Sequence, residues 1–336
     1  MTDCRPGLIS AEILALFQKA TRPLILCHHN PDGDALGSAA GIAGAFAAQG
    51  ARPDVFLLGT WSEHLGFLLE GLAPVQDVAD ISAYDLTVLL DCHGFDRLGP
   101  EGSALAAKIS EARTPVVIID HHLLGENETA GPLWIHDAAA SSTGELVWLL
   151  IKALGWKVTA ASARGLLMAL VSDTGFFSQS NATAGAFRAA ADLVEAGGDI
   201  EDIKRRLHME QPLRRLKLMG LALGTLSTHF DGRLGVMTVT PDMLAEAGAQ
   251  MSDTEEFVEI ARSLSGVALA AFIKDAGKGP GSIRVSLRSR PEINARGLAV
   301  FFGGGGHKQA SAYNDPRAAD SREALANLLA EAGRFL

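Results

Sequence analysis

The stretch PLILCHHNPDGDALG, residues 23–37, places a short apolar run directly before histidines, carboxylates and glycines. Such a run is typical of a buried strand whose carboxyl end opens into a loop, and α/β folds build their sites at that end. Residues two apart in an extended segment point the same way, so Asp32 and Asp34 can face one cavity with His28 at its edge. Taken alone, the motif fits a metal site and a capped loop equally well, because Asp also forms turns and helix caps.

The length and composition of the chain limit the classes of protein it can be. At 336 residues it is long enough for two domains, and its 48% hydrophobic and 20% charged residues are typical of a soluble globular protein. The net charge of −10 argues against a surface that coats polyanions, although it leaves room for a local basic pocket. No apolar run is long enough to span a bilayer, and residues 1–7 lack a signal-peptide pattern. Cys4, Cys27 and Cys92 form no CxxC pair or disulfide framework, so we predict a cytoplasmic protein.

Strand-like and helix-like segments alternate in the first half of the chain. Short apolar runs predict strands over residues 24–28, 54–58, 85–91 and 115–120, and other segments predict helices over 35–49, 143–154 and 164–171. Each strand is separated from the next by enough chain for a crossover. This pattern predicts an α/β fold with a doubly wound, mainly parallel sheet that is covered on both faces.

The pattern changes after a helical region at residues 184–226. Residues 229–233 have the composition of a hairpin turn, strands are expected over 234–240, 267–274 and 282–290, and helices over 254–264 and 294–301. This second half predicts a smaller α+β domain. We therefore divide the chain into a first domain at residues 1–200, a helical connector at 201–228 and a second domain at 229–336.

Three more acidic residues follow apolar runs in the first domain. Asp91 ends the run VLLD, Asp120 ends VIID and is followed by His121 and His122, and Asp173 follows ALVS. Interpreted as strand ends, these segments and the first motif would meet at one edge of the sheet, where several like charges are costly without cations. Carboxylate and imidazole ligands suit Mn, Mg or Zn. Their number is sufficient for two ions that share one carboxylate.

A glycine run and an arginine-rich strand stand out in the second domain. The run Gly303–Gly306 precedes His307, and Arg284, Arg288 and Arg290 alternate with apolar residues and so share one face. A flexible loop and a solvated strand face are the simpler explanations. In a net-acidic chain, however, this combination favours a pocket for phosphate or carboxylate. By contrast, we interpret residues 141–145 as a helix N-cap and the basic residues between 204 and 217 as a solvated helix face.

The combined motifs resemble the DHH phosphoesterase superfamily. In the first domain the resemblance rests on His28-x-x-x-Asp32-x-Asp34, Asp91, the Asp120–His122 triplet and Asp173. In the second domain, the segment around Arg288 together with Gly303–His307 resembles the DHH-associated C-terminal domain. Together they span most of the chain. Within the superfamily, a two-domain chain of this length is similar to the bacterial oligoribonuclease and 3′-phosphoadenosine 5′-phosphate (pAp) phosphatase type.

The resemblance implies a set of roles for these residues. One divalent cation would bind His28, Asp32 and Asp91, and a second would bind Asp34, Asp91, His121 and Asp173, with Mn²⁺ preferred and Mg²⁺ or Co²⁺ as alternatives. Asp91, Asp120 and His122 would form the catalytic group, in which Asp120 orients an imidazole and His122 lies near the scissile phosphate. Arg288, Arg290, His307, Gly304, Gly305 and Gly306 would bind substrate, and the active site would lie in a cleft between the domains.

The activity implied is the hydrolysis of short single-stranded RNA or DNA oligonucleotides to nucleoside monophosphates, and of pAp to AMP. An alternative is a cyclic di-AMP or pApA phosphodiesterase, and a non-catalytic nucleotide sensor is disfavoured because no ligand of the motifs is missing. Long duplex nucleic acid and membranes are not expected partners, and the sequence leaves a homodimer open. One residue departs from the family pattern, His93 after Asp91, and we interpret it as incidental.

Overall fold

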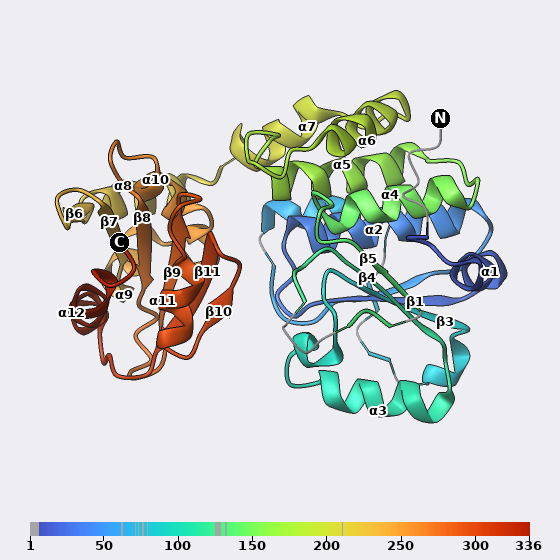
Figure 1. The fold of residues 1–336 in the computed structure, drawn as a ribbon, viewed down its shortest axis with the longest axis horizontal. Coiled ribbons are helices and arrows are strands. Elements are labelled where there is room, and N and C mark those ends of the chain that lie inside the picture. Colours follow the sequence, from blue (N-terminus) through green and yellow to red (C-terminus); the bar gives the residue numbers. More distant parts are fainter. Residues whose placement is uncertain are drawn as a thin grey trace. The chain divides into compact units, whose positions relative to one another are not determined.

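The computed structural model describes residues 7–61, 63–70, 72, 74–75, 77–78, 80–124, 129–131, 133–209 and 211–336 (Figure 1). The chain divides into two compact units, Met1–Met209 and Glu210–Leu336. Cys27 and Cys92 are buried free thiols in the first unit, whereas Cys4 lies outside the described residues. No helix of the described part is long and apolar enough to cross a membrane.

The first unit is built on a five-stranded parallel sheet in the order β2-β1-β3-β4-β5. Its strands are β1 (Pro23–Cys27), β2 (Asp54–Phe56), β3 (Leu86–Leu90), β4 (Val116–Asp120) and β5 (Trp134–His136). Every residue of β1 and β3 is buried, as expected when both faces of a parallel sheet are covered. The predicted α/β fold with a doubly wound, mainly parallel sheet is therefore confirmed.

Helices cover both faces of this sheet (Figure 1). The larger core lies beneath α1 (Ala11–Lys19), α2 (Gly33–Ala48), α4 (Thr143–Ala153), α5 (Ala160–Thr174) and α6 (Ala184–Glu195). The opposite face packs against α3 (Gly102–Ala112) and the short helices η2 (Ile81–Ala83) and η3 (Phe95–Leu98). Three further short helices belong to this unit: η1 (Glu63–Leu69), α7 (Ile200–Lys204) and η4 (Arg205–Met209).

Helices α2 and α5 approach one another through glycines. A Cβ atom on Gly37 would lie 2.5 Å from the Gly165 carbonyl oxygen, and one on Gly165 would lie 2.6 Å from the Gly37 carbonyl oxygen. The contact is therefore between two backbones, which cannot give way as a flexible side chain can. Asp34 lies near the start of α2 and Asp173 near the end of α5, so this contact also sets how close these two carboxylates are.

We expect Gly37→Ala to lower the free energy of unfolding by about 1–3 kcal/mol, because the added methyl group overpacks the contact between α2 and α5. The matched control is Gly220→Ala in α8 (Leu213–Leu223), where an added Cβ would meet no atom within 4 Å. At that exposed position we expect a gain of up to about 1 kcal/mol, because Ala favours a helix over Gly. Urea denaturation measures both, and equal effects would contradict the packing argument.

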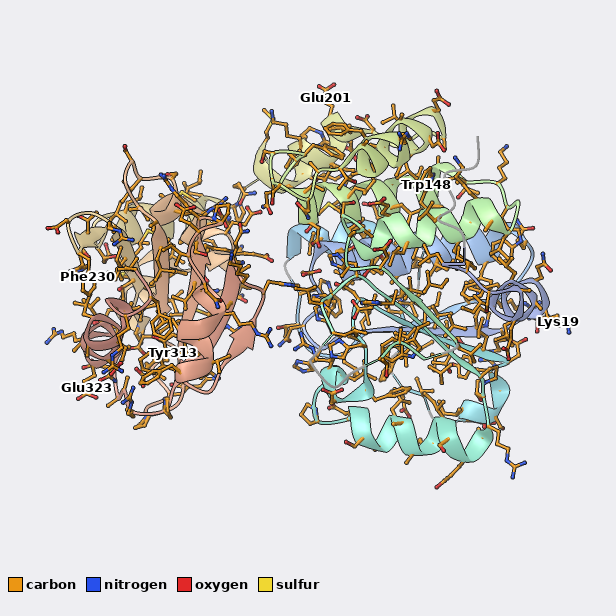
Figure 2. All side chains as sticks on the ribbon, viewed as in Figure 1. Lys19, Trp148, Glu201, Phe230, Tyr313 and Glu323 are labelled. Carbon is orange, nitrogen blue, oxygen red and sulfur yellow. The ribbon has the colours of Figure 1, made fainter. Side chains whose placement is uncertain are left out.

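The second unit is built on a six-stranded mixed sheet in the order β10-β11-β9-β8-β7-β6. Its strands are β6 (Ser227–His229), β7 (Leu234–Val239), β8 (Leu269–Lys274), β9 (Ile283–Ser289), β10 (Gly305–Gly306) and β11 (Ala310–Asp315). Only β7 and β8 are parallel neighbours. One face packs on α11 (Ala295–Phe301) and α12 (Ser321–Ala332). Tyr313, which is labelled in Figure 2, belongs to this core, and its ring stacks on that of Phe302. The other face packs on α8, α9 (Pro241–Ala247) and α10 (Phe257–Arg262), next to η5 (Met251–Thr254).

The basic region between residues 204 and 217 is not one solvated helix face. Arg215 is only 5% exposed, and its guanidinium donates to the backbone oxygens of Asp253 and Glu255 at 2.7 and 2.9 Å. It also lies over the ring of Phe257. The prediction was wrong for this residue because α8 buries one side in the core of the second unit. The region 201–228 is thus divided: α7 and η4 lie in the first unit, and α8 lies in the second.

Candidate metal centre

The carboxyl ends of β1 and β3 are the starting point of the candidate site. The strand order reverses between these two neighbours, because β2 lies on one side of β1 and β3 on the other. In open α/β sheets such a switch point leaves a crevice in which ligands bind. His28 follows the last residue of β1, and Asp91 follows the last residue of β3. The fold therefore places both residues at the edge where a site is expected.

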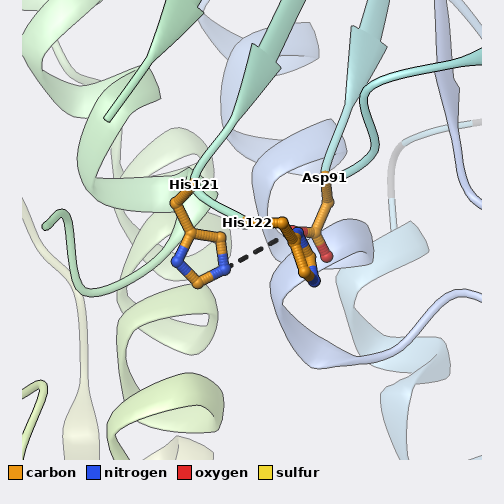
Figure 3. Close-up of side chains that lie close together, drawn as sticks. All are labelled: Asp91, His121 and His122. Atoms are coloured by element: carbon orange, nitrogen blue, oxygen red, sulfur yellow. Dashed lines mark ion pairs between the residues drawn. The ribbon is translucent and has the colours of Figure 1, made fainter. Parts of the chain in front are cut away.

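Asp91 is the centre of this arrangement. It is 2% exposed and has a left-handed backbone with φ of 59°, which Asp tolerates better than most residues. Its Oδ2 lies 3.5 Å from His28 Nε2, and its Oδ1 lies 3.7 Å from His121 Nε2 and 3.6 Å from His122 Nδ1 (Figure 3). The Thr143 hydroxyl donates to Asp91 Oδ1 at 2.9 Å. Three imidazoles and a hydroxyl thus surround a single carboxylate.

Asp32 and Asp34 take different positions at the start of α2. Asp32 is the helix N-cap, since its Oδ1 accepts from the backbone nitrogens of Asp34 and Ala35 at 3.0 and 3.1 Å. It is also 3.9 Å from His28 Nε2. The capping and ligand interpretations of this motif are therefore compatible, because the second oxygen of Asp32 takes no part in these two cap bonds.

Asp34 is fully buried, and the start of α4 holds it. Its oxygens accept from the backbone nitrogens of Thr143 and Gly144 at 2.7 and 3.0 Å and from the Ser38 hydroxyl at 3.1 Å. A helix N-terminus favours a negative charge in this position. Residues 141–145 do form the predicted N-cap, in which Ser142 accepts from the Glu145 nitrogen. The sequence did not reveal that this helix end also fixes Asp34 and Asp91, because the contacts join residues 110 and 52 apart in the chain.

Asp173 reaches the site from a helix. It lies in the last turn of α5, and its Oδ2 is 3.1 Å from His121 Nε2, which is also 3.6 Å from Asp34 Oδ2. The predicted helix over residues 164–171 is confirmed within α5, whereas the interpretation of residues 169–173 as an acidic strand end is wrong. Its apolar run belongs to a helix that is buried among other helices, and this is why no polar face marks it. Sequence analysis did not single out Asn181, whose side-chain amide donates to the carbonyl oxygens of Asp173 and Ser141.

Asp120 links two histidines behind the site. This residue is fully buried at the end of β4, and its Oδ1 accepts from the His122 backbone nitrogen at 3.1 Å and lies 2.7 Å from His122 Nδ1. Its other oxygen, Oδ2, lies 3.3 Å from His93 Nδ1. His93, interpreted from the sequence as incidental, is therefore in contact with the carboxylate that orients His122.

The imidazoles and carboxylates of the site shift one another's pKa. Burial lowers the pKa of His28, but the hydrogen bond to Asp91 and the charges of Asp32 and Asp91 outweigh burial and raise that pKa to about 9. Burial also lowers the pKa of His121, but Asp173 and Asp34 raise it to about 10. Burial raises the pKa of Asp91, yet the three imidazoles outweigh burial and hold that pKa below its usual range. Burial and then the charges of Asp91 and Asp173 raise the pKa of Asp34 well above normal. The site thus concentrates negative charge that cations can neutralise.

The side chains fit divalent cations. Three sets each bring one ligand atom per residue within 4.8 Å of the others: His28, Asp32 and Asp91; Asp34, His121 and Asp173; and Asp91, His121 and His122. All of these atoms are carboxylate oxygens or imidazole nitrogens, which suit Mn²⁺, Mg²⁺ and Zn²⁺. Burial raises the pKa of the Cys27 and Cys92 thiols, which keeps both protonated and unsuited as ligands. The structure brings together all six residues expected to bind metal.

The residues expected to bind substrate lie in the second unit. Arg288 projects from β9, and its Nε is 3.3 Å from Glu259 Oε1 on α10. Arg290, which follows β9, and His307, in the turn between β10 and β11, are exposed. The glycine run is not a flexible loop, since Gly305 and Gly306 form β10 and pair with Ala312 and Ser311. Gly304 is required by packing, because a Cβ there would lie 2.2 Å from the Ala312 carbonyl oxygen.

Comparisons with known proteins bear on this arrangement. Two family models match the chain: the DHH family, N-terminal domain, over residues 22–170, and the DHHA1 domain over residues 232–336. A Thermus thermophilus protein, "Bifunctional oligoribonuclease and PAP phosphatase NrnA", is 32% identical over 287 residues, which are 85% of this chain and 82% of that protein. The chain belongs to the DHH family of phosphoesterases. The resemblance inferred from the motifs is thus confirmed.

Other DHH relatives differ in how much of the chain they match. The cyclic-di-AMP phosphodiesterase GdpP of Geobacillus thermodenitrificans is 26% identical over 91% of this chain, which corresponds to only 46% of GdpP. A probable manganese-dependent inorganic pyrophosphatase of Streptococcus agalactiae is 29% identical over 52% of this chain and 55% of that protein. A crystal structure of an exopolyphosphatase-related protein from Bacteroides fragilis superposes with a TM-score of 0.86 at 25% identity, over 98% of this chain and 97% of that one.

Proposed function

We propose that this DHH protein is a Mn²⁺-dependent hydrolase of phosphate esters in short nucleotides. The observation that carries the proposal is the position of Asp91. This residue belongs to two sets of possible ligands, His28–Asp32–Asp91 and Asp91–His121–His122. Its Oδ1 also lies 3.7 Å from Nε2 of His121, which belongs to the third set, Asp34–His121–Asp173. One carboxylate between two clusters of ligands is the arrangement that a pair of adjacent cations requires.

The ligands divide between two proposed cation positions. His28, Asp32 and Asp91 would hold one, and Asp34, Asp91, His121 and Asp173 would hold the other. Bound there, two divalent cations would supply a water that is nucleophilic at neutral pH and would neutralise charge on the phosphate. The similarity to a probable manganese-dependent pyrophosphatase supports Mn²⁺ over Mg²⁺ or Co²⁺.

The protein's own groups would position the reaction. Asp120 orients the ring of His122, which we propose lies near the scissile phosphate. The start of α4 fixes Asp34 and Asp91 by three hydrogen bonds, so these carboxylates need not reorganise when the substrate arrives. In the DHHA1 domain, Arg288 and His307 would bind a phosphate or the nucleotide, with Arg290 beside them and the backbone of Gly304, Gly305 and Gly306 close to the ligand.

We propose short single-stranded oligonucleotides and pAp as the substrates. The relative that supports this choice, NrnA of Thermus thermophilus, is named an oligoribonuclease and PAP phosphatase, and it is matched over most of both chains. A cyclic di-AMP or pApA phosphodiesterase is the second candidate, because GdpP is similar over most of this chain although the match spans less than half of GdpP. Both activities would use the same chemistry on different nucleotides.

A substrate panel separates these candidates. In Mn²⁺ buffer we expect release of phosphate from pAp and of nucleoside monophosphates from RNA of two to five nucleotides, with turnover of cyclic di-AMP at least about 100-fold slower. Chelation by EDTA should remove all activity, and renewed Mn²⁺ should restore it. Faster turnover of cyclic di-AMP than of pAp would favour the second candidate. Activity that survives exhaustive chelation would contradict the proposed chemistry.

A further inference from the structure

The Asp120 carboxylate contacts two imidazoles at once. This residue is fully buried at the end of β4, so its oxygens need hydrogen-bond donors from the protein. Oδ1 accepts from the backbone nitrogen of His122 at 3.1 Å and lies 2.7 Å from His122 Nδ1. The partner that the structure gives to Oδ2 is His93, whose Nδ1 is 3.3 Å away. His93 and His122 therefore hold this carboxylate from its two oxygens.

Two carboxylates compete for the ring of His122 (Figure 3). Its Nδ1 is 2.7 Å from Asp120 Oδ1 and 3.6 Å from Asp91 Oδ1. When Nδ1 donates to Asp120, the Nε2 edge of the ring is directed away from Asp120 and can meet the substrate, and Asp91 keeps its oxygens for cations. Rotation of the Asp120 carboxylate would weaken the shorter contact and favour the longer one. The orientation of Asp120 thus decides which carboxylate His122 binds.

The other two imidazoles around Asp91 are oriented by the backbone. Their Nδ1 atoms lie against carbonyl oxygens, at 3.1 Å for His28 with His29 and at 3.4 Å for His121 with Ala140. A carbonyl oxygen is fixed by the fold, whereas the carboxylate of an aspartate rotates over a broad range about its bond to Cβ. The ring of His122 therefore depends on a group that itself has to be held in place.

His93 reaches Asp120 from the turn that follows β3. Asp91 has a left-handed backbone there, and two residues later the His93 side chain is 27% exposed, with Nδ1 on the side of Asp120. A histidine with no role on such a turn would direct its polar ring to water. This one instead directs a ring nitrogen inward, to the oxygen of Asp120 that His122 does not use.

We propose that His93 is a positioning residue for the hydrolysis: it holds the Asp120 carboxylate, so that Asp120 keeps the ring of His122 directed at the substrate and away from Asp91. This inference rests on the proposed function. It adds to the reaction a residue that acts through another side chain and contacts neither the substrate nor a cation. The path of contacts runs from His93 through Asp120 to His122.

Three substitutions separate the donated hydrogen bond from the bulk of the His93 ring. His93→Leu and His93→Gln remove the bond, because leucine has no donor and the glutamine amide lies one bond too far out, whereas in His93→Asn the amide nitrogen takes about the place of Nδ1. We expect kcat for pAp to fall about 10-fold in the first two, with KM within about 2-fold, and to return to within about 3-fold in His93→Asn. The matched control, His229→Leu, alters a partly buried histidine of β6 and should leave kcat unchanged.

A double-mutant cycle tests whether His93 acts only through Asp120. We expect Asp120→Asn alone to lower kcat by about 50-fold, and the addition of His93→Leu to change that value by less than about 2-fold. Losses that multiply would overturn the positioning role, because His93 would then act by a separate route. His93→Gln gives the same comparison with a polar side chain if His93→Leu lowers the stability of the protein.

A further readout needs neither metal nor turnover. In the metal-free protein, the proton on His122 Nδ1 should give a downfield, slowly exchanging NMR signal, assigned with isotope-labelled histidine, because that nitrogen lies 2.7 Å from a buried carboxylate oxygen. We expect the signal in the natural protein and in His93→Asn, and its loss in His93→Leu and His93→Gln. An unchanged signal in both loss variants would overturn the proposal. Failure of the proposed function would appear separately, as absent turnover by the natural protein in Mn²⁺.

Discussion

Replacement of Asp91 with alanine is expected to lower kcat for pAp and for short RNA by at least about 1000-fold, or about 4 kcal/mol in activation free energy. No other carboxylate of the centre lies within 4 Å of all three imidazoles, and the proposed cation positions share it. Its loss should therefore remove ligands from both positions. The measurement is the rate of Mn²⁺-dependent release of phosphate and nucleoside monophosphate.

Three comparisons make this result specific to the Asp91 carboxylate. Asp91→Asn keeps the size of the side chain and its tolerance of the left-handed backbone, so it tests the charge without adding backbone strain. Asp96→Ala removes an exposed carboxylate from the same segment and should leave kcat within about 2-fold of the natural value. Metal analysis should find two Mn²⁺ per chain in the natural protein and fewer in both Asp91 variants. Retention of more than a tenth of the activity by either Asp91 variant would contradict the shared-ligand model.

The sequence predicted the first unit well because its strands are short and buried on both faces. β1 and β3 are buried along their whole length and β4 along all but its first residue, and the histidine or carboxylate at the end of each strand marks the functional edge of the sheet. The parallel order then brings these ends together without further information. This is why His28, Asp91 and Asp120 could be placed at one site from local patterns alone.

The contributions of helices to the site could not be predicted in the same way. Residues 164–171 were predicted as a helix, yet 169–173 were also interpreted as an acidic strand end, because an apolar run such as 166–171 has no periodicity that separates a buried strand from a buried helix. The hydrogen bonds from Thr143 and Gly144 to Asp34 depend on how α4 packs against α2, which no local pattern encodes. The close contact at Gly37 has the same origin. These features follow from tertiary packing and appear in the sequence only as an N-cap and scattered glycines.

The residues of the second unit show a related limit, because the same residue type can serve the fold or a ligand. Arg215 and Arg288 both lie in basic stretches, yet Arg215 is buried and bound to backbone oxygens, whereas the side chain of Arg288 is 36% exposed on a strand. Likewise, backbone geometry or packing requires Gly303, Gly304 and Gly306 but not Gly305. Only the surroundings of each residue separate the two roles.

Replacement of Arg288 with alanine is the second large effect that we expect, with kcat/KM for pAp reduced by about 100-fold, or about 2.7 kcal/mol. Arg288 is positioned by Glu259 on α10, and its guanidinium can bind a phosphate through two parallel hydrogen bonds. A residue that binds substrate and does not hold the cations should change KM more than it changes the Mn²⁺ content.

Two variants test this interpretation of Arg288. Arg322→Ala removes an exposed arginine of α12 in the same unit and should leave kcat/KM unchanged. Glu259→Gln keeps the shape of the side chain that holds Arg288 but removes its charge, so we expect a smaller loss of about 10-fold. If Arg288→Ala instead lost Mn²⁺ while KM stayed constant, the residue would act on the metal centre, and the division of labour between the two domains would be wrong. A larger loss in Glu259→Gln than in Arg288→Ala would point to a direct role for Glu259, because a residue that acts only by holding Arg288 cannot contribute more than Arg288 itself.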